Sequence, residues 1–134
     1  MSPSAMTHPQ VVEGIRAAIA TYCQALDDGR TDDVVATFCP DGVMEIPGSS
    51  PLEGQDAIRE SYSRFKWQRP QRHVVVNTLV TDWNDHEAKA ISDLIVLQKG
   101  ESGWAVQLVG RYHDTFQNKD NSWRFHRRTL SFVN

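Results

Sequence analysis

The chain has 134 residues, of which 40% are hydrophobic and 23% charged, and its formal net charge is −3. This size and composition are typical of one globular domain with its own core. The acidic balance argues against nucleic acid or an anionic membrane as a partner. No apolar run approaches the roughly 20 residues of a membrane span, and the polar first ten residues lack the apolar core of a signal peptide. We therefore expect a cytoplasmic protein with a flexible tail, residues 1–8, and one domain over residues 9–134.

The first half of the chain has helical spacing. Apolar residues recur at three- and four-residue intervals from Pro9 to Asp28, which predicts an amphipathic helix. A second, short helix is predicted from an N-cap at Thr31 to a point before Pro40. A short strand over residues 43–46 and a third helix over residues 55–65 follow.

The second half of the chain has the pattern of long strands. They are predicted over residues 72–83, 87–99, 104–118 and 122–133, with hairpin turns between them. Helices followed by a meander of strands indicate an α+β fold. A curved antiparallel sheet with helices against one face leaves a concave cavity, and such cavities are common ligand sites.

Three polar residues spread along the chain are the candidates for chemistry. Asp27 ends the first helix, His73 opens a valine-rich strand, and Arg128 lies in the final strand. An imidazole oriented by a carboxylate is a general base suited to neutral pH. An arginine nearby can hold the negative charge that the reaction develops. If the fold brings the three together, the protein is a small enzyme that moves protons.

The order of short motifs extends this prediction to nearly the whole chain. The motifs are Tyr22-x-x-x-Leu26-Asp27, Phe38-Cys39-Pro40-Asp41-Gly42, Gly54-x-x-x-Ile58, His73-x-x-x-Asn77, Gly110-x-Tyr112-x-Asp114, and Trp123-x-Phe125 followed by Arg128. In this order the chain resembles the SnoaL-like members of the nuclear transport factor 2-like superfamily. The resemblance implies a cone-shaped α+β barrel, in which a bent antiparallel or mixed sheet wraps the N-terminal helices around a deep pocket. It also implies activity without cofactor or metal.

The same resemblance implies roles for four residues. The superfamily includes scytalone dehydratase, bile acid 7α-dehydratase and hexachlorocyclohexane dehydrochlorinase, and this branch uses an Asp–His pair that Asp27 and His73 match. Arg128 matches an arginine of the dehydrochlorinase, and Tyr22 matches a tyrosine of the bile acid dehydratase. We therefore expect these four residues to be catalytic, with Asp27 fixing the tautomer of His73.

Further side chains are expected to bind the substrate. Strand alternation places Asn77 and Leu79 on the face of His73, and Leu108, Gly110 and Tyr112 on one face of the next strand but one. Alternation also groups Arg128 with His126, although periodicity alone does not say which face of that strand is inward. The expected substrate-binding residues are Tyr112, Asn77, Trp67, Phe65, Met44 and Leu108.

These residues favour a cofactor-independent lyase of the dehydratase type, acting on a small hydrophobic ring compound. An isomerase or a polyketide-cyclase-like enzyme would use the same base. A binding module without chemistry and an accessory subunit of a larger enzyme are alternatives of another class. Apolar strand residues that lie on the face away from His73, or on a face that the sequence leaves undetermined, predict a homodimer or homotrimer; among them are Val74, Val76, Ile91 and Val109.

Overall fold

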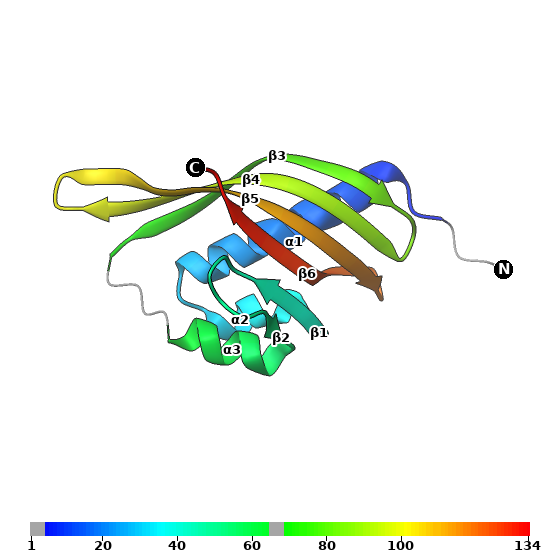
Figure 1. Ribbon diagram of the computed structural model, residues 1–134. Helices are drawn as coiled ribbons and strands as arrows, with labels where there is room; N and C mark the ends of the chain where they lie inside the picture. The colour runs from blue at the N-terminus through cyan, green and yellow to red at the C-terminus, as the bar shows by residue number, and fades with distance from the viewer. Residues whose placement is uncertain (1–4, 65–68) are drawn as a thin grey trace.

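The computed structural model of the protein describes residues 5–64 and 69–134. Three helices and six strands follow the order helix, helix, strand, strand, helix and then four strands (Figure 1). They are α1 (His8–Asp27), α2 (Thr31–Ala36), β1 (Phe38–Glu45), β2 (Leu52–Glu53), α3 (Gln55–Ser63), β3 (Gln71–Trp83), β4 (Glu87–Gly100), β5 (Gly103–Lys119) and β6 (Ser122–Phe132). None of the described helices is long and apolar enough to cross a membrane. The α+β class predicted from the sequence is confirmed.

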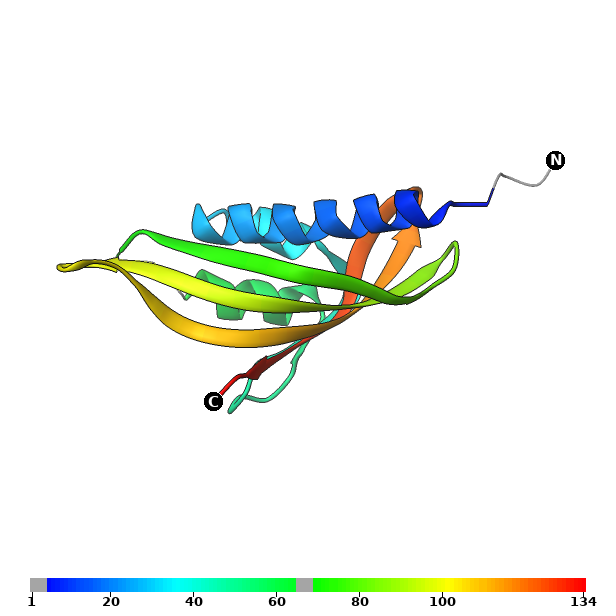
Figure 2. The same cartoon turned by 90° about the horizontal axis from the view of Figure 1, so that it is seen from above.

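The six strands form one mixed sheet in the order β2-β1-β6-β5-β4-β3. Strand β1 runs parallel to β6, and every other neighbouring pair is antiparallel. Over the described parts of the chain the edge strands β2 and β3 do not pair with each other, so the expected barrel is an open, bent half-barrel. Helix α1 runs lengthwise beside β3 and shields that edge (Figure 2).

The start of α1 is tied to the domain more firmly than a tail over residues 1–8 implies. Thr7 and Gln10 form a capping box, which satisfies amide groups in the first turn. The backbone N–H of Met6 donates to Asp85 at 2.9 Å, and the His8 ring lies 5.5 Å from that of Trp83. Residues 6–8 therefore pack against the β3–β4 turn.

The connection from α2 to β1 differs from the prediction in two respects. Arg30, not Thr31, is the N-cap residue of α2, and no side chain caps this end. Strand β1 starts at Phe38 rather than at Val43, and it passes through Pro40. Proline is tolerated there because the pairing with β6 is irregular between Phe38 and Val43, so no regular ladder hydrogen bond is lost.

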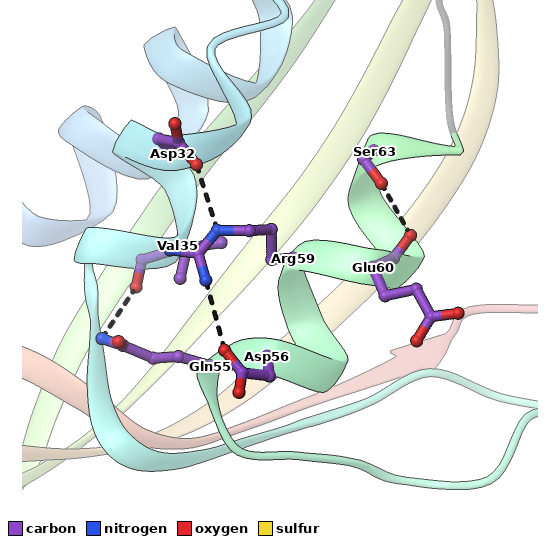
Figure 3. A network of polar contacts seen from close by, with 7 residues as sticks. All are labelled: Asp32, Val35, Gln55, Asp56, Arg59, Glu60 and Ser63. Atoms are coloured by element: carbon purple, nitrogen blue, oxygen red, sulfur yellow. Dashed lines mark hydrogen bonds and ion pairs between the residues drawn. The ribbon is translucent and has the colours of Figure 1, made fainter.

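Polar contacts join α3 to α2 (Figure 3), and Gln55 of α3 also contacts the start of β1. The Arg59 guanidinium bridges the carboxylates of Asp32 and Asp56, at 3.1 and 3.4 Å. The side-chain amide of Gln55 donates to the backbone carbonyl of Phe38 at 2.9 Å. The ion pairs are exposed and contribute little each, but together with the amide contact they orient α3 so that Tyr62 is buried.

Two β-bulges reverse the strand faces expected from simple alternation. Asn77 has a φ of +56°, and the β3–β4 register shifts there, so Thr78 follows His73 on the inner face and Leu79 is 67% exposed. In β6 the register shifts around His126. Arg128 therefore shares the inner face with Phe125, and the expected grouping of Arg128 with His126 is wrong because a bulge adds one residue to the strand.

The N-terminal half of α1 packs against the indole of Trp123. A Cβ atom built on Gly14 would lie 2.3 Å from Cδ1 of that indole, so only glycine allows this approach.

We expect Gly14→Ala to destabilise the protein by about 1–3 kcal/mol, even though alanine favours a helix by about 1 kcal/mol over glycine. Urea unfolding measures the difference. The exposed Thr21→Ala in the same helix is the control, with an expected gain of about 0.5 kcal/mol. A Gly14→Ala protein as stable as the wild type would contradict the packing argument.

Candidate active site

A cavity of about 360 Å³ lies between the C-terminal half of α1, helix α3 and the inner face of the sheet. This volume falls within the range of small-molecule sites. Its wall is mainly apolar, with a few tyrosine, glutamine and histidine groups. The lining residues are Tyr22, Leu26, Met44, Ile46, Tyr62, Gln71, His73, Leu94, Val96, Gln98, Gln107, Leu108, Tyr112, Leu130 and Phe132.

Asp27 and His73 form a close pair at the edge of this cavity. The Nδ1 atom of His73 lies 2.6 Å from Oδ1 of Asp27, and the backbone N–H of His73 donates to Oδ2 at 2.8 Å. The two side chains are only 9% and 5% exposed. Because an ionised carboxylate only accepts hydrogen bonds, Nδ1 carries the hydrogen, and Nε2 is then the basic nitrogen of the neutral ring.

The fold places this pair by joining the end of a helix to the start of a strand. Asp27 is the last residue of α1, where a carboxylate is disfavoured by the helix dipole. Three donors compensate for that position, since Gln71 Nε2 also donates to Oδ1 at 3.1 Å. Tyr22 and Asp27 are not on one helix face. Tyr22 lines the cavity itself, whereas Asp27 reaches it through the His73 ring.

A second polar group in the cavity is a pair of tyrosines. The hydroxyl oxygens of Tyr22 and Tyr62 lie 2.6 Å apart. Burial raises the pKa of both phenols, and it also raises the pKa of Tyr112, while the charge of Arg128 acts in the opposite direction on all three. These phenols therefore stay protonated at neutral pH and present hydrogen-bond donors to whatever enters the cavity.

Arg128 lies beneath these tyrosines and not on the cavity wall. Its guanidinium carbon is 3.4 Å from the ring centre of Tyr112, 4.3 Å from that of Tyr22 and 4.4 Å from that of Phe125. The side chain is completely buried. Such stacking stabilises a desolvated cation. The expected direct contact between Arg128 and a substrate is therefore corrected, because the rings that stabilise the guanidinium also separate it from the cavity.

Asp114 is the counter-ion of Arg128, and the two residues are direct cross-strand partners in the β5–β6 register. Arg128 Nε lies 3.2 Å from Asp114 Oδ1, but the N–H is not aimed at the oxygen, so the contact is an ion pair without a hydrogen bond. Burial raises the pKa of Asp114 to about 6, against the opposing effect of Arg128. This carboxyl group is thus close to its titration point under ordinary conditions.

The other predicted binding residues divide into three groups. Tyr112, Met44 and Leu108 line the cavity. Asn77 does not, because its bulge turns the side chain outward to donate to Asp93 at 2.9 Å. Phe65 and Trp67 lie outside the described residues.

Sequence reasoning missed four polar cavity residues, Tyr62, Gln71, Gln98 and Gln107. Tyr62 belongs to the apolar stripe of α3 and gave no signal other than that of a core aromatic residue. Gln71 stands two positions before His73 and therefore shares its strand face, which is a signal that alternation offered. Among the described residues no group of three or more His, Cys, Asp or Glu side chains is arranged to hold a metal ion.

The open α+β half-barrel around a cavity is the nuclear transport factor 2-like fold, and in this chain a histidine–carboxylate pair lies at the cavity edge. The chain belongs to the SnoaL-like family, because the model of the SnoaL-like domain matches residues 10–129. The family assignment made from the motifs is thereby confirmed.

Solved structures with the same fold come from several bacteria. A protein of Novosphingobium aromaticivorans, provisionally named scytalone dehydratase, is 23% identical with a TM-score of 0.82, over 96% of this chain and 89% of its own. ActVI-ORFA of Streptomyces coelicolor is 18% identical with a TM-score of 0.82, over 91% and 96%. The β subunit of a provisionally named aromatic-ring-hydroxylating dioxygenase of N. aromaticivorans is 19% identical with a TM-score of 0.81, over 96% and 93%. These likenesses establish the fold.

The buried Asp114 carboxyl gives the protein a pH-dependent stability. Its folded pKa of about 6 lies above the value of about 3.9 for an exposed aspartate. The folded state therefore binds more protons between these values, and the free energy of unfolding decreases as the pH rises from 4 to 6, by roughly 3 kcal/mol from this group. We expect Asp114→Asn to flatten that slope in urea unfolding measured from pH 4 to pH 7. Asp56→Asn, at a fully exposed carboxylate, is the control, and an unchanged slope in Asp114→Asn would refute the assignment.

Proposed function

We propose that the protein is a cofactor-independent lyase that eliminates water from a hydrophobic ring compound, with His73 as the general base. The observation that carries the proposal is the 2.6 Å contact between Asp27 and Nδ1 of His73 at the wall of an apolar cavity. The contact orients the ring and leaves Nε2 as its basic nitrogen. A base held in this manner is suited to removing a proton from carbon at neutral pH.

The proposed reaction starts at a carbon next to a carbonyl group. His73 Nε2 takes the proton, and the electron pair of the C–H bond enters the carbonyl as an enolate. The enolate then forms a carbon–carbon double bond while the C–O bond to the neighbouring hydroxyl group breaks. The proton on His73 passes to the departing oxygen, so water leaves and the neutral imidazole is restored. Asp27 stays ionised throughout and stabilises the transient imidazolium.

The tyrosine pair supplies the stabilisation that the enolate needs. Tyr22 and Tyr62 are hydrogen-bonded to each other, so one of the two hydroxyl hydrogens is available to the carbonyl oxygen of a substrate. Their raised pKa keeps them as donors. Arg128 acts on this step through the tyrosine rings, because its charge favours negative charge building up on them.

Isomerisation or cyclisation would begin with the same proton transfer and differ only in the fate of the enolate. A non-catalytic binding module or an accessory subunit would use the cavity without proton transfer. Assays for water release and for product structure distinguish isomerisation and cyclisation from elimination. Ligand binding without any turnover would indicate a binding module or an accessory subunit.

His73→Ala is expected to lower kcat/KM for ring-bearing hydroxy ketones by about 10²–10⁴. Asp27→Asn should also impair activity, because the amide no longer fixes the Nδ1–H tautomer. The measurement is the rate at which the absorbance of the conjugated product rises, for the wild type and each variant at one pH. His113→Ala, at an exposed position on the other face of β5, is the control. Full activity in His73→Ala would exclude the proposed base.

We also propose that the protein is a homodimer or homotrimer assembled through the outer face of the sheet. On this face Ile95 lies opposite Val109, and Leu97 lies opposite Val106. Val106 and Val109 are 58% and 42% exposed, and Val74 on β3 lies opposite Ile95. An apolar stripe that crosses three strands is more than scattered surface residues and is suited to burial against another copy.

Val109→Lys is expected to shift the protein from oligomer to monomer at micromolar concentration, because it places a charge in the centre of the apolar stripe. Sedimentation or light scattering measures the mass. Glu13→Lys, on the exposed side of α1, is the control for a changed net charge. A wild type that is already monomeric would refute the assembly.

A further inference from the structure

Gln71 carries a hydrogen-bonding atom that the described structure does not use. The residue opens β3 two positions before His73, and the two side chains share the cavity wall. Gln71 is 1% exposed. Its Oε1 atom is buried and has no hydrogen-bond partner among the described residues. An unpaired buried carbonyl oxygen is unfavourable, so this atom is placed to gain from a bound donor.

Chemistry determines which end of the amide faces Asp27. The Gln71 nitrogen is 3.1 Å from Oδ1 of Asp27. An ionised carboxylate has only acceptors, so the NH₂ group must point toward it and Oε1 must point elsewhere. The same carboxylate oxygen accepts from Nδ1 of His73. Gln71 and His73 are therefore held side by side by one group, and Oε1 of Gln71 is turned away from it.

We propose that Gln71 binds a hydroxyl group of the substrate. Its Oε1 atom would accept a hydrogen bond from this hydroxyl, next to the carbon that His73 deprotonates. The statement about the deprotonated carbon rests on the proposed function. The binding of a hydroxyl group by Gln71 does not depend on that function. The ligand class is an uncharged ring compound that bears a phenol, enol or alcohol group. An ether or ketone of the same shape lacks a donor and leaves Oε1 unpaired, and sites built for a donor discriminate against such analogues.

The test compares the binding of 2-naphthol with that of 2-methoxynaphthalene, which has a similar shape but no donor. Titration calorimetry on the full chain is expected to give at least a tenfold preference for the naphthol. Gln71→Met has a similar length and no amide, so its preference should fall below about twofold through loss of naphthol affinity. Gln24→Met, on the exposed side of α1, is the matched control and should keep the wild-type preference.

Several outcomes would overturn the assignment. They are equal affinity of the wild type for both compounds, no binding of either at millimolar concentration, or an undiminished preference in Gln71→Met. A crystal structure of the wild-type complex tests the assignment even if the variant does not fold. A naphthol oxygen within about 3 Å of Oε1 supports it, and a hydroxyl directed elsewhere contradicts it.

The result is separable from the proposed elimination. If Gln71 sets the preference but neither the wild type nor His73→Ala turns over any hydroxy ketone, the lyase proposal fails and the hydroxyl site stands. If turnover depends on His73 but the preference for 2-naphthol is the same in Gln71→Met as in the wild type, the lyase proposal stands and this inference fails.

Discussion

The site depends on one carboxylate that joins two distant parts of the chain. Asp27 ends α1, and its oxygens accept from the backbone and the ring of His73 and from the amide of Gln71. These contacts fix where β3 begins relative to the helix. They also fix the direction of the imidazole, since backbone and ring are held by the same group. An aspartate at a helix C-terminus is unfavourable by itself, and the three donors are what make the position tenable.

Beneath the cavity a second polar arrangement serves packing more than contact with a ligand. Arg128 is buried with its guanidinium against three aromatic rings and one carboxylate. Removing such a pair from water is costly, and buried pairs often stabilise a fold no more than apolar residues would. The arrangement nevertheless determines where Tyr22 and Tyr112 stand. It also places a fixed positive charge behind hydroxyl groups that face the cavity.

Much of the architecture was predictable because the patterns are local. The spacing of apolar residues in α1, the hairpin turns and the long alternating strands each depend on neighbours within a few positions. The shared face of Leu108, Gly110 and Tyr112 was also predicted correctly, since β5 is regular over that stretch. Alternation failed at Asn77 and His126, where one added residue moves the following side chains to the other face. No local sequence pattern predicts such a bulge.

The α+β class, the family and the candidate pair Asp27 and His73 could be predicted without a structure, because they follow from periodicity and from the order of motifs. How the side chains contact one another depends on the folded arrangement of the whole chain. This arrangement brought the two residues to 2.6 Å, placed Arg128 behind tyrosines instead of on the wall, and revealed Tyr62 and Gln71 as cavity residues. The physical reason is that contacts between residues tens of positions apart depend on sheet curvature, bulges and helix docking, which no short segment encodes.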